Sequence, residues 1–271
     1  MSDAILFYRL GWQAIWKQKI IFLYYAAFLF ANQFSPYISY LQDNFLWLRC
    51  LLVPYTLVIL PISLIAGLIG GIFISHKITQ SEHLLFNDIF QLIKKHFWRF
   101  TKLFVLIGFI GALFWISGFL LQYRIKGFEI EPFIFLFAFV SALFTGFWLF
   151  AFTKFLIKDH GVFKSISGAW KLFCKNLPAL TAMGIICYGM WYIPNLIIAV
   201  IFEVIRSNFS LTVFSAINFL APGILLQENL AYLLMIYIIS IFSQALANTS
   251  FMYAYHQYSQ VEKYSDKKIP G

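Results

Sequence analysis

Residues 159–178 read DHGVFKSISGAWKLFCKNLP, and this stretch decides how the rest of the chain is interpreted. Apolar residues recur at helical spacing on one side, and basic or small polar residues occupy the other. The apolar side comprises Val162, Phe163, Ile166, Trp170, Phe173 and Leu177, and the polar side comprises Lys164, Ser167, Lys171 and Lys175. This pattern is typical of an amphipathic helix that lies in the membrane–water interface. Because a proline disfavours helical backbone in the residue before it, we expect this helix to end or kink at Pro178.

Two earlier segments, residues 2–19 and 81–102, repeat the pattern. We therefore expect three amphipathic surface helices on the cytoplasmic side of a membrane. The basic residues that we expect to contact anionic lipid headgroups lie on the second and third of these helices, and are Lys94, Lys95, Arg99, Lys164, Lys171 and Lys175. The alternative is that these charges only set the topology during insertion.

The composition points to the same environment. The chain has 271 residues, of which 61% are hydrophobic and only 11% are charged, whereas a soluble domain carries about 25% charged residues. Several apolar runs reach the roughly 20 residues that cross about 30 Å of hydrocarbon. We therefore predict an all-α polytopic membrane protein with six transmembrane helices. The predicted spans are residues 20–37, 50–74, 103–121, 132–157, 178–202 and 229–255.

The second predicted span contains residues that alter helix geometry. Pro54 and Pro61 remove backbone hydrogen bonds and should bend it, so neighbouring groups must satisfy the freed carbonyls. Gly67, Gly70 and Gly71 follow in the same span. Because small residues let two helix backbones approach closely, we expect another helix to pack tightly there.

The three surface helices align with one another at offsets of 78 and 80 residues. The positions that coincide are the basic Lys17, Lys95 and Lys175 and the aromatic Trp12, Phe90 and Trp170. This alignment predicts one membrane domain over residues 1–260, built from pseudo-repeats 1–79, 80–158 and 159–260, with a polar, mobile tail at 261–271. The alternative is that aromatic-rich amphipathic helices align this well by chance.

Lysine and arginine are distributed unevenly around the predicted spans. The N-terminus, the two loops that hold surface helices and the C-terminal tail carry 16 of them, and the opposite side carries 4. Positive charge is enriched in cytoplasmic segments, so we expect both termini in the cytoplasm. The same distribution accounts for the net charge of +9 and argues against a nucleic-acid partner.

Two stretches, residues 155–166 (FLIKDHGVFKSI) and 170–176 (WKLFCKN), resemble an uncharacterised family of bacterial inner-membrane proteins with six spans. Related membrane domains are fused to some glycerophosphodiester phosphodiesterases. Residues 249–258, at the end of the last predicted span, are similar to the family as well. The resemblance implies the fold and a location in the bacterial inner (cytoplasmic) membrane. The family offers no established catalytic residues, and we expect no phosphodiesterase domain in this chain.

The predicted spans carry few groups suited to chemistry. No charged residue falls in the middle of a span, which disfavours a proton-coupled pump. The five histidines lie at the predicted cytoplasmic edge, the three cysteines are isolated, and neither set shows the spacing of a metal site. We therefore expect no catalytic residue, no metal and no cofactor.

Milder polar residues mark one face of the fifth and sixth predicted spans. Ser240, Gln244 and Asn248 are spaced by four and share one side of the sixth span, and Asn195 follows Pro194 in the fifth. They could line a polar substrate path between the two spans. The alternative, which we favour, is hydrogen bonding between helices, worth about 0.6 kcal/mol on average in measured cases.

These observations predict a non-enzymatic integral inner-membrane protein with a lipid-handling, assembly or envelope-maintenance role. Its expected partners are membrane phospholipids. The alternative is a permease subunit of a transporter that couples to a separate ATPase or to another membrane protein. A surface helix before the first span suits that layout, but no residue identifies such a partner.

Overall fold

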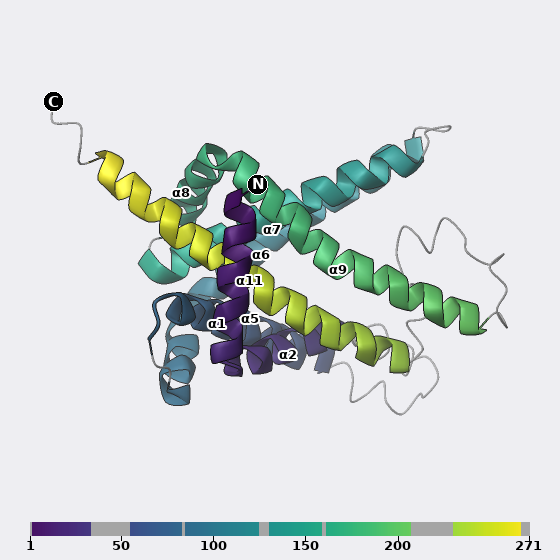
Figure 1. Cartoon of the computed structure of the whole chain (residues 1–271), viewed down its shortest axis with the longest axis horizontal. Coiled ribbons are helices and arrows are strands. Elements are labelled where there is room, and N and C mark those ends of the chain that lie inside the picture. The colour runs from purple at the N-terminus through teal and green to yellow at the C-terminus, as the bar shows by residue number, and fades with distance from the viewer. Residues whose placement is uncertain are drawn as a thin grey trace. The chain divides into compact units, whose positions relative to one another are not determined.

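The computed structural model describes residues 2–33, 55–82, 85–124, 130–158, 161–206 and 230–266. Within these residues all regular structure is helical and there is no strand, so the prediction of an all-α chain is confirmed (Figure 1). The elements in chain order are α1 (Ser2–Lys17), α2 (Ile20–Gln33), the π-helix η1 (Tyr55–Ile59), α5 (Leu60–Thr79), α6 (Phe86–Arg124), α7 (Ile130–Lys158), α8 (Val162–Lys175), α9 (Leu177–Arg206) and α11 (Leu230–Asp266).

Four of these helices contain a stretch that is long and apolar enough to cross a membrane. The stretches are Leu57–Thr79, Phe86–Leu113, Leu177–Phe202 and Ala231–Gln260. Two shorter apolar stretches, Ile20–Phe30 and Gly146–Ile157, lie on α2 and α7. These lengths apply to the part of the chain that the structure describes, and they are consistent with a membrane protein.

The chain divides into two compact units. Unit 1 consists of Met1–Gln18, Ile69–Tyr188 and Leu246–Gly271, and unit 2 consists of Lys19–Leu68 and Gly189–Ala245. Both units are made of segments that are distant in the sequence, so each depends on contacts between helices rather than on local structure.

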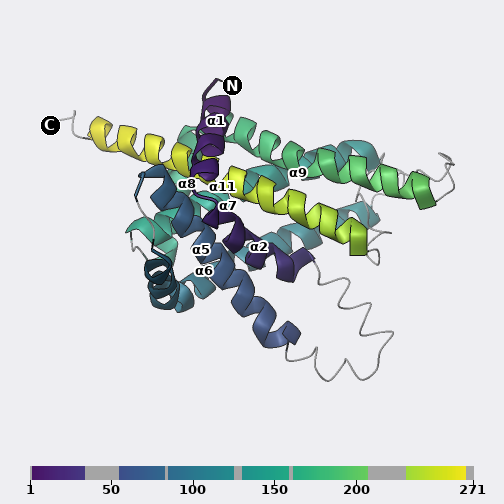
Figure 2. The same cartoon turned by 60° about the horizontal axis from the view of Figure 1, so that its bottom comes forward.

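Unit 2 is held together around α2, which lies beside the first part of α11 (Figure 2). The Tyr237 hydroxyl donates a hydrogen bond of 2.7 Å to the Ala26 carbonyl. The rings of Phe22 and Phe242 stack with centroids 6.1 Å apart. A buried cluster then joins α9 to α11, and its members are Ile198, Ala199, Tyr232, Leu233 and Ile236.

The close approach predicted for the second span is confirmed at Gly67. A Cβ atom placed on Gly67 would lie 2.7–2.8 Å from the backbone and Cβ of Phe28 in α2. Real Cβ atoms essentially never come so near to other heavy atoms, so only glycine permits this contact between α5 and α2. The packing of α5 against α2 in unit 2 therefore requires glycine at position 67.

In unit 1, α1 contacts α9, and α6 contacts α7. The Tyr8 hydroxyl of α1 donates a hydrogen bond of 3.0 Å to the Met183 carbonyl of α9. Burial, together with the neighbouring Cys187 thiol, raises the pKa of Tyr8 well above its ordinary value, so the hydroxyl stays a donor. The Phe152 ring of α7 packs on Phe100 of α6, with centroids 4.3 Å apart.

The sharp turn before Pro178 is confirmed. Helix α8 ends at Lys175, and α9 begins at Leu177 (Figure 1). Asn176 leaves the helical conformation with φ −117° and ψ 24°, and its backbone N–H bonds to the Phe173 carbonyl. Its side-chain amide donates to the Leu172 carbonyl at 3.0 Å, so the last turn of α8 is capped by the residue that breaks it.

Three other boundaries differ from the sequence expectation. The second surface helix and the third span form one uninterrupted helix, α6, because no proline or glycine separates them near Thr101. The polar tail begins as helix, since α11 continues to Asp266. Where a bend is expected at Pro61, the structure has the π-helix η1, which ends two residues earlier at Ile59. Such a local adjustment can re-satisfy carbonyls freed by a proline.

Several predictions lie outside the described residues. They concern the end of the first span at 34–37, the whole loop at 38–49, the start of the second span at 50–54, His83, the loop at 125–129, His160, the connection at 207–229 and the tail from 267 on.

Replacing Gly67 with alanine should destabilise the protein by about 1–3 kcal/mol, because the added methyl group overlaps the α2 backbone. The matched control is Gly108→Ala in α6, where an added Cβ meets nothing within 4 Å. Alanine is the better helix former, so the control should be neutral or slightly stabilising. The measurement is the thermal unfolding midpoint in detergent. Equal midpoints for the two variants would contradict the close contact.

Candidate functional site

The basic residues predicted to contact lipid lie on two helices of unit 1. Lys94, Lys95 and Arg99 are on α6, and Lys164, Lys171 and Lys175 are on α8. All six side chains are exposed. The Arg99 guanidinium also lies over the Phe155 ring of α7, 5.5 Å from its centroid.

Large aromatic side chains are exposed on the same two helices. On α6 they are Phe86, Phe90 and Trp98, the last with 74% of its surface exposed. On α8 they are Phe163 and Trp170, with 81% and 56% exposed. A water-facing helix does not normally present such residues beside lysine, whereas aromatic and basic side chains occur together at membrane interfaces.

The side of α8 that packs into the protein agrees only in part with the predicted apolar side, because the two share Phe173 alone. It is made of Ser165, Ala169, Leu172 and Phe173, all buried. Small residues at Ser165 and Ala169 allow a close approach, and α7 supplies Phe147, whose ring meets Trp170 and Phe173 edge-on. Of the expected apolar residues, Phe163, Trp170 and Leu177 are exposed, and Val162 and Ile166 are only partly buried. The signal in the sequence was the spacing of Ser165 and Ala169, four residues apart.

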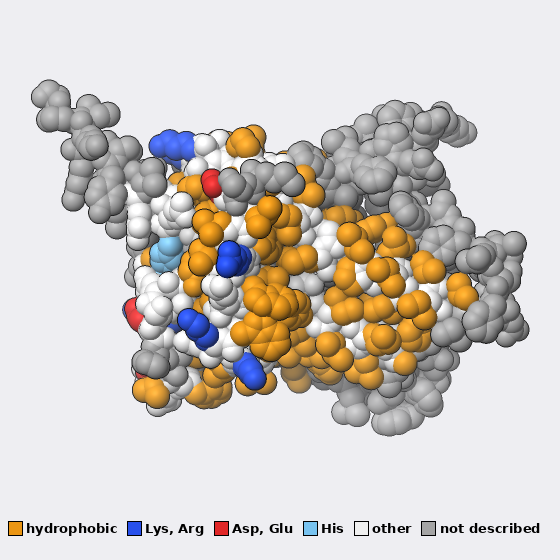
Figure 3. Space-filling model, viewed as in Figure 1, with side chains coloured by type: hydrophobic (Ala, Val, Ile, Leu, Met, Phe, Trp, Pro, Cys, Tyr) orange, Lys and Arg blue, Asp and Glu red, His pale blue; other side chains and the backbone are white. Residues whose placement is uncertain are grey.

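Charged side chains are distributed very unevenly between the units. Among the side chains that the structure describes in unit 2, Lys19 is the only charged one. In Figure 3 the visible Lys and Arg side chains gather on one part of the face, and a broad part is hydrophobic without any charge. Unit 2 therefore has the surface of a protein in hydrocarbon, whereas unit 1 also carries groups suited to lipid headgroups.

The polar residues predicted within the fifth and sixth spans do not all find partners. Asn195 and Ser240, in unit 2, and Asn248, in unit 1, are each only 3% exposed, and Gln244 in unit 2 is half-buried. Among the described residues, neither the Ser240 hydroxyl nor the amide of Asn248 has a hydrogen-bond partner.

Hydrogen bonds between helices occur instead at neighbouring residues that the sequence did not single out. The Ser243 hydroxyl donates to the Met190 carbonyl at 3.2 Å in unit 2. In unit 1 the hydroxyls of Thr249 and Ser75 lie 3.4 Å apart. Each bond links α11 to another helix through a small side chain, as is common inside membrane bundles.

Two histidines that are 180 residues apart form a pair in unit 1. His76 Nδ1 of α5 and His256 Nε2 of α11 are 2.9 Å apart, and their rings stack with centroids separated by 5.0 Å. One ring nitrogen must donate and the other accept, so at least one of the two imidazoles is neutral. The sequence placed both residues at the same membrane edge but gave no signal that they meet.

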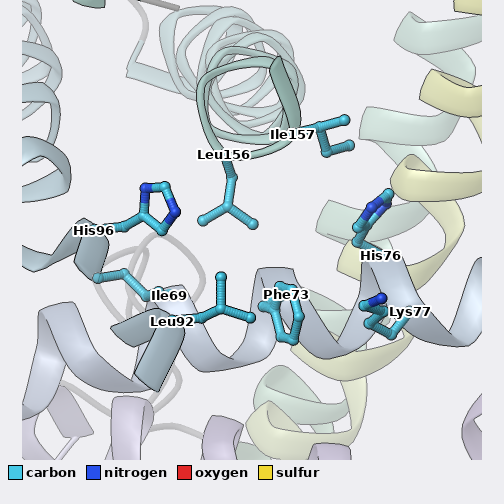
Figure 4. A pocket seen from close by; sticks show the side chains of 8 residues that line it. All are labelled: Ile69, Phe73, His76, Lys77, Leu92, His96, Leu156 and Ile157. Carbon is cyan, nitrogen blue, oxygen red and sulfur yellow. The ribbon is translucent and has the colours of Figure 1, made fainter. Parts of the chain in front are cut away.

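His76 also lines a pocket of about 300 Å³ within unit 1. Three helices supply its walls: α5, α6 and α7. The lining residues are Ile69, Phe73, His76, Lys77, Leu92, His96, Leu156 and Ile157. Figure 4 shows His96 and His76 on opposite sides, with Leu156, Leu92 and Phe73 between them. The pocket thus combines three nitrogen-bearing side chains with five apolar ones.

No group of three or more His, Cys, Asp or Glu side chains that could hold a metal ion occurs in the described part of the chain. The described residues do offer two candidate sites, the exposed basic and aromatic surface and the pocket.

Comparison with protein-family models, with curated proteins and with solved structures finds no match to this chain. The resemblance described from residues 155–166 therefore stays an expectation.

The histidine pair should stabilise unit 1 through a specific coupling between α5 and α11. In a double-mutant cycle with His76→Leu, His256→Leu and the double variant, the coupling free energy should be about 0.5–1.5 kcal/mol. The measurement is thermal unfolding in detergent at neutral pH. A matched cycle with His76→Leu and Lys102→Gln, which lies apart on the exposed side of α6, should show additive effects. Additivity in both cycles would mean that the two imidazoles do not interact.

Proposed function

We propose that this protein is a non-enzymatic bacterial inner-membrane protein with a lipid-handling, assembly or envelope-maintenance role, and that its surface helices dock on anionic lipid headgroups. The observation that carries this proposal is the joint exposure of basic and aromatic side chains on α6 and α8. Helix α1 supports it, because Trp12 and Trp16 are about half exposed beside the exposed Lys17.

The energetics favour a local effect of these charges. A Lys or Arg close to an anionic membrane surface contributes about 1 kcal/mol, and the attraction fades within a Debye length. The spans already hold the protein in the bilayer, so docking decides how the helices lie and which lipids gather around them. Exposed rings such as Phe163 and Trp170 then enter the interface beside the lysines.

We further propose that the chain crosses the membrane six times. Three of the four long apolar stretches fall in the second, fifth and sixth predicted spans. The fourth, Phe86–Leu113, covers the predicted second surface helix and the beginning of the third predicted span. The shorter stretch Gly146–Ile157 belongs to α7, whose 29 residues exceed the roughly 20 that a span requires. The stretch Ile20–Phe30 begins the first predicted span, which continues beyond the described residues.

The proposed repeat is supported by matching exposure at aligned positions. Trp12, Phe90 and Trp170 are all exposed, and the residues directly before them, Gly11, Ile89 and Ala169, are all buried. In each surface helix, the aligned aromatic position is therefore exposed and the position before it is buried. The uninterrupted course of α6 is a difference between the second unit of the repeat and the other two.

Topology is tested by cysteine labelling. Single cysteines at Asn44, Gly127 and Asn208 in a cysteine-free version should react with an impermeant thiol reagent applied from outside, because 16 of 20 basic residues lie on the other side. Cysteines replacing Ser167 or Gln91 should react only after the membrane is opened. The reverse labelling pattern would invert the proposed orientation.

Lipid docking is tested by changing Lys94, Lys95, Lys171 and Lys175 together to glutamine. The anionic phospholipid retained after purification should fall, because four charges at the headgroup level are lost. Topology should hold, since 12 basic residues remain on the cytoplasmic side. The control changes the same four residues to arginine and should retain lipid like the parent. Equal lipid retention in the glutamine variant and the parent would leave these lysines with a topological role only.

A further inference from the structure

We propose that the pocket between α5, α6 and α7 binds one anionic phospholipid by its phosphate headgroup and the adjoining part of an acyl chain. This inference rests on the proposed lipid-handling function and names a specific site for it. The pocket is separate from the exposed lysines of α6 and α8, none of which lines it.

The walls of the pocket match the two chemical parts of such a lipid. Lys77 can supply a positive charge and N–H donors, and His76 and His96 can supply imidazole N–H groups to phosphate oxygens. Between them Leu92, Leu156 and Phe73 form an apolar passage (Figure 4). A free phosphate ion would use the nitrogen atoms but leave this apolar surface facing water, whereas a lipid covers both.

The size of the pocket indicates how much of the lipid enters. Ligand sites range over about 300–1,000 Å³, and this pocket, at about 300 Å³, lies at the lower end of that range. It therefore accommodates a headgroup and the first part of one chain, and the rest of the lipid lies along the outside of the helices. Phe90 and Trp98 of α6 are exposed in the same helix as Leu92 and His96, as expected for a helix in contact with lipid.

The histidine pair sets what His76 can offer to the ligand. When His256 Nε2–H donates to His76 Nδ1, 2.9 Å away, the neutral His76 carries its own proton on Nε2, and this N–H can donate to a phosphate oxygen. The stacked His256 ring also fixes the orientation of the His76 ring. A ring held in this way loses little conformational freedom when it binds a phosphate oxygen.

Lys77 forms an ion pair with Glu82, and its ammonium also lies 5.8 Å from the centre of the Phe73 ring. The Glu82 side chain is 44% exposed and is not among the residues that line the pocket. A lipid phosphate would compete with this carboxylate for Lys77. Removal of the Glu82 charge should consequently strengthen lipid binding, a direction that a loss of folding could not produce.

The test uses the full-length protein in detergent, with phosphatidylglycerol titrated in and bound lipids counted by native mass spectrometry. The parent protein should bind one phosphatidylglycerol more tightly than any further copy. Lys77→Gln should weaken this first site about fivefold, the factor for one charge at a membrane surface. Glu82→Gln should strengthen it by a similar factor. Leu92→Trp should abolish it by filling the passage, and the control Lys102→Gln should bind like the parent.

Three results would overturn the proposal: unchanged binding in Leu92→Trp, weaker or unchanged binding in Glu82→Gln, or equal affinity for zwitterionic phosphatidylcholine. Displacement of the lipid by inorganic phosphate at a concentration equal to that of the lipid would also count against it, because equal affinity would show that the apolar walls add nothing. The surface variant of Lys94, Lys95, Lys171 and Lys175 should keep the first site while it loses weakly held lipid. If that variant loses no lipid but Lys77→Gln does, surface docking fails and the pocket stands. If the surface variant loses lipid but Lys77→Gln does not, the pocket proposal fails and surface docking stands.

Discussion

Backbone hydrogen bonding in an apolar environment is the constraint on which this structure depends. Hydrocarbon offers no partner to an exposed N–H or C=O, so a chain that enters it must satisfy these groups within its own helices. The long apolar helices follow from this requirement, and so do the devices at their interruptions. At Pro61 a π-helical turn precedes the residue that cannot donate. At Asn176 the side-chain amide caps α8 before α9 begins.

Once the helices satisfy their own backbones, their contacts depend on small residues and single hydrogen bonds. Apolar side chains gain little from leaving lipid for protein, so close packing has to supply the attraction. Gly67 against Phe28 is such a contact in unit 2. The large rings that these contacts do not bury remain on the outside, where they suit the membrane interface.

The proposed lipid functions use two places where polar groups can reach a lipid, the surface of α6 and α8 and the pocket between α5, α6 and α7. In the proposed surface docking, the exposed lysines of α6 and α8 would meet headgroups at the surface, where each charge is screened and acts weakly. The pocket holds Lys77 and two imidazoles beside apolar walls, where fewer charges act on one lipid at a fixed place. The partly exposed Glu82 forms an ion pair with Lys77, the residue whose charge the pocket would use.

The sequence alone determined the local features. Helical periodicity and the proline at 178 gave the existence and end of α8, composition indicated the membrane, and Gly67 marked a close approach. The sequence did not determine where every helix ends. Between Phe97 and Ile107 no residue indicated whether the surface helix and the span would be separate or form the single helix α6. Only the tertiary structure brought His76 to His256 and gathered Lys77, Leu92 and Leu156 around one pocket. The physical reason is that periodicity describes one helix at a time, whereas these contacts depend on which helices pack together and on how each is rotated about its axis.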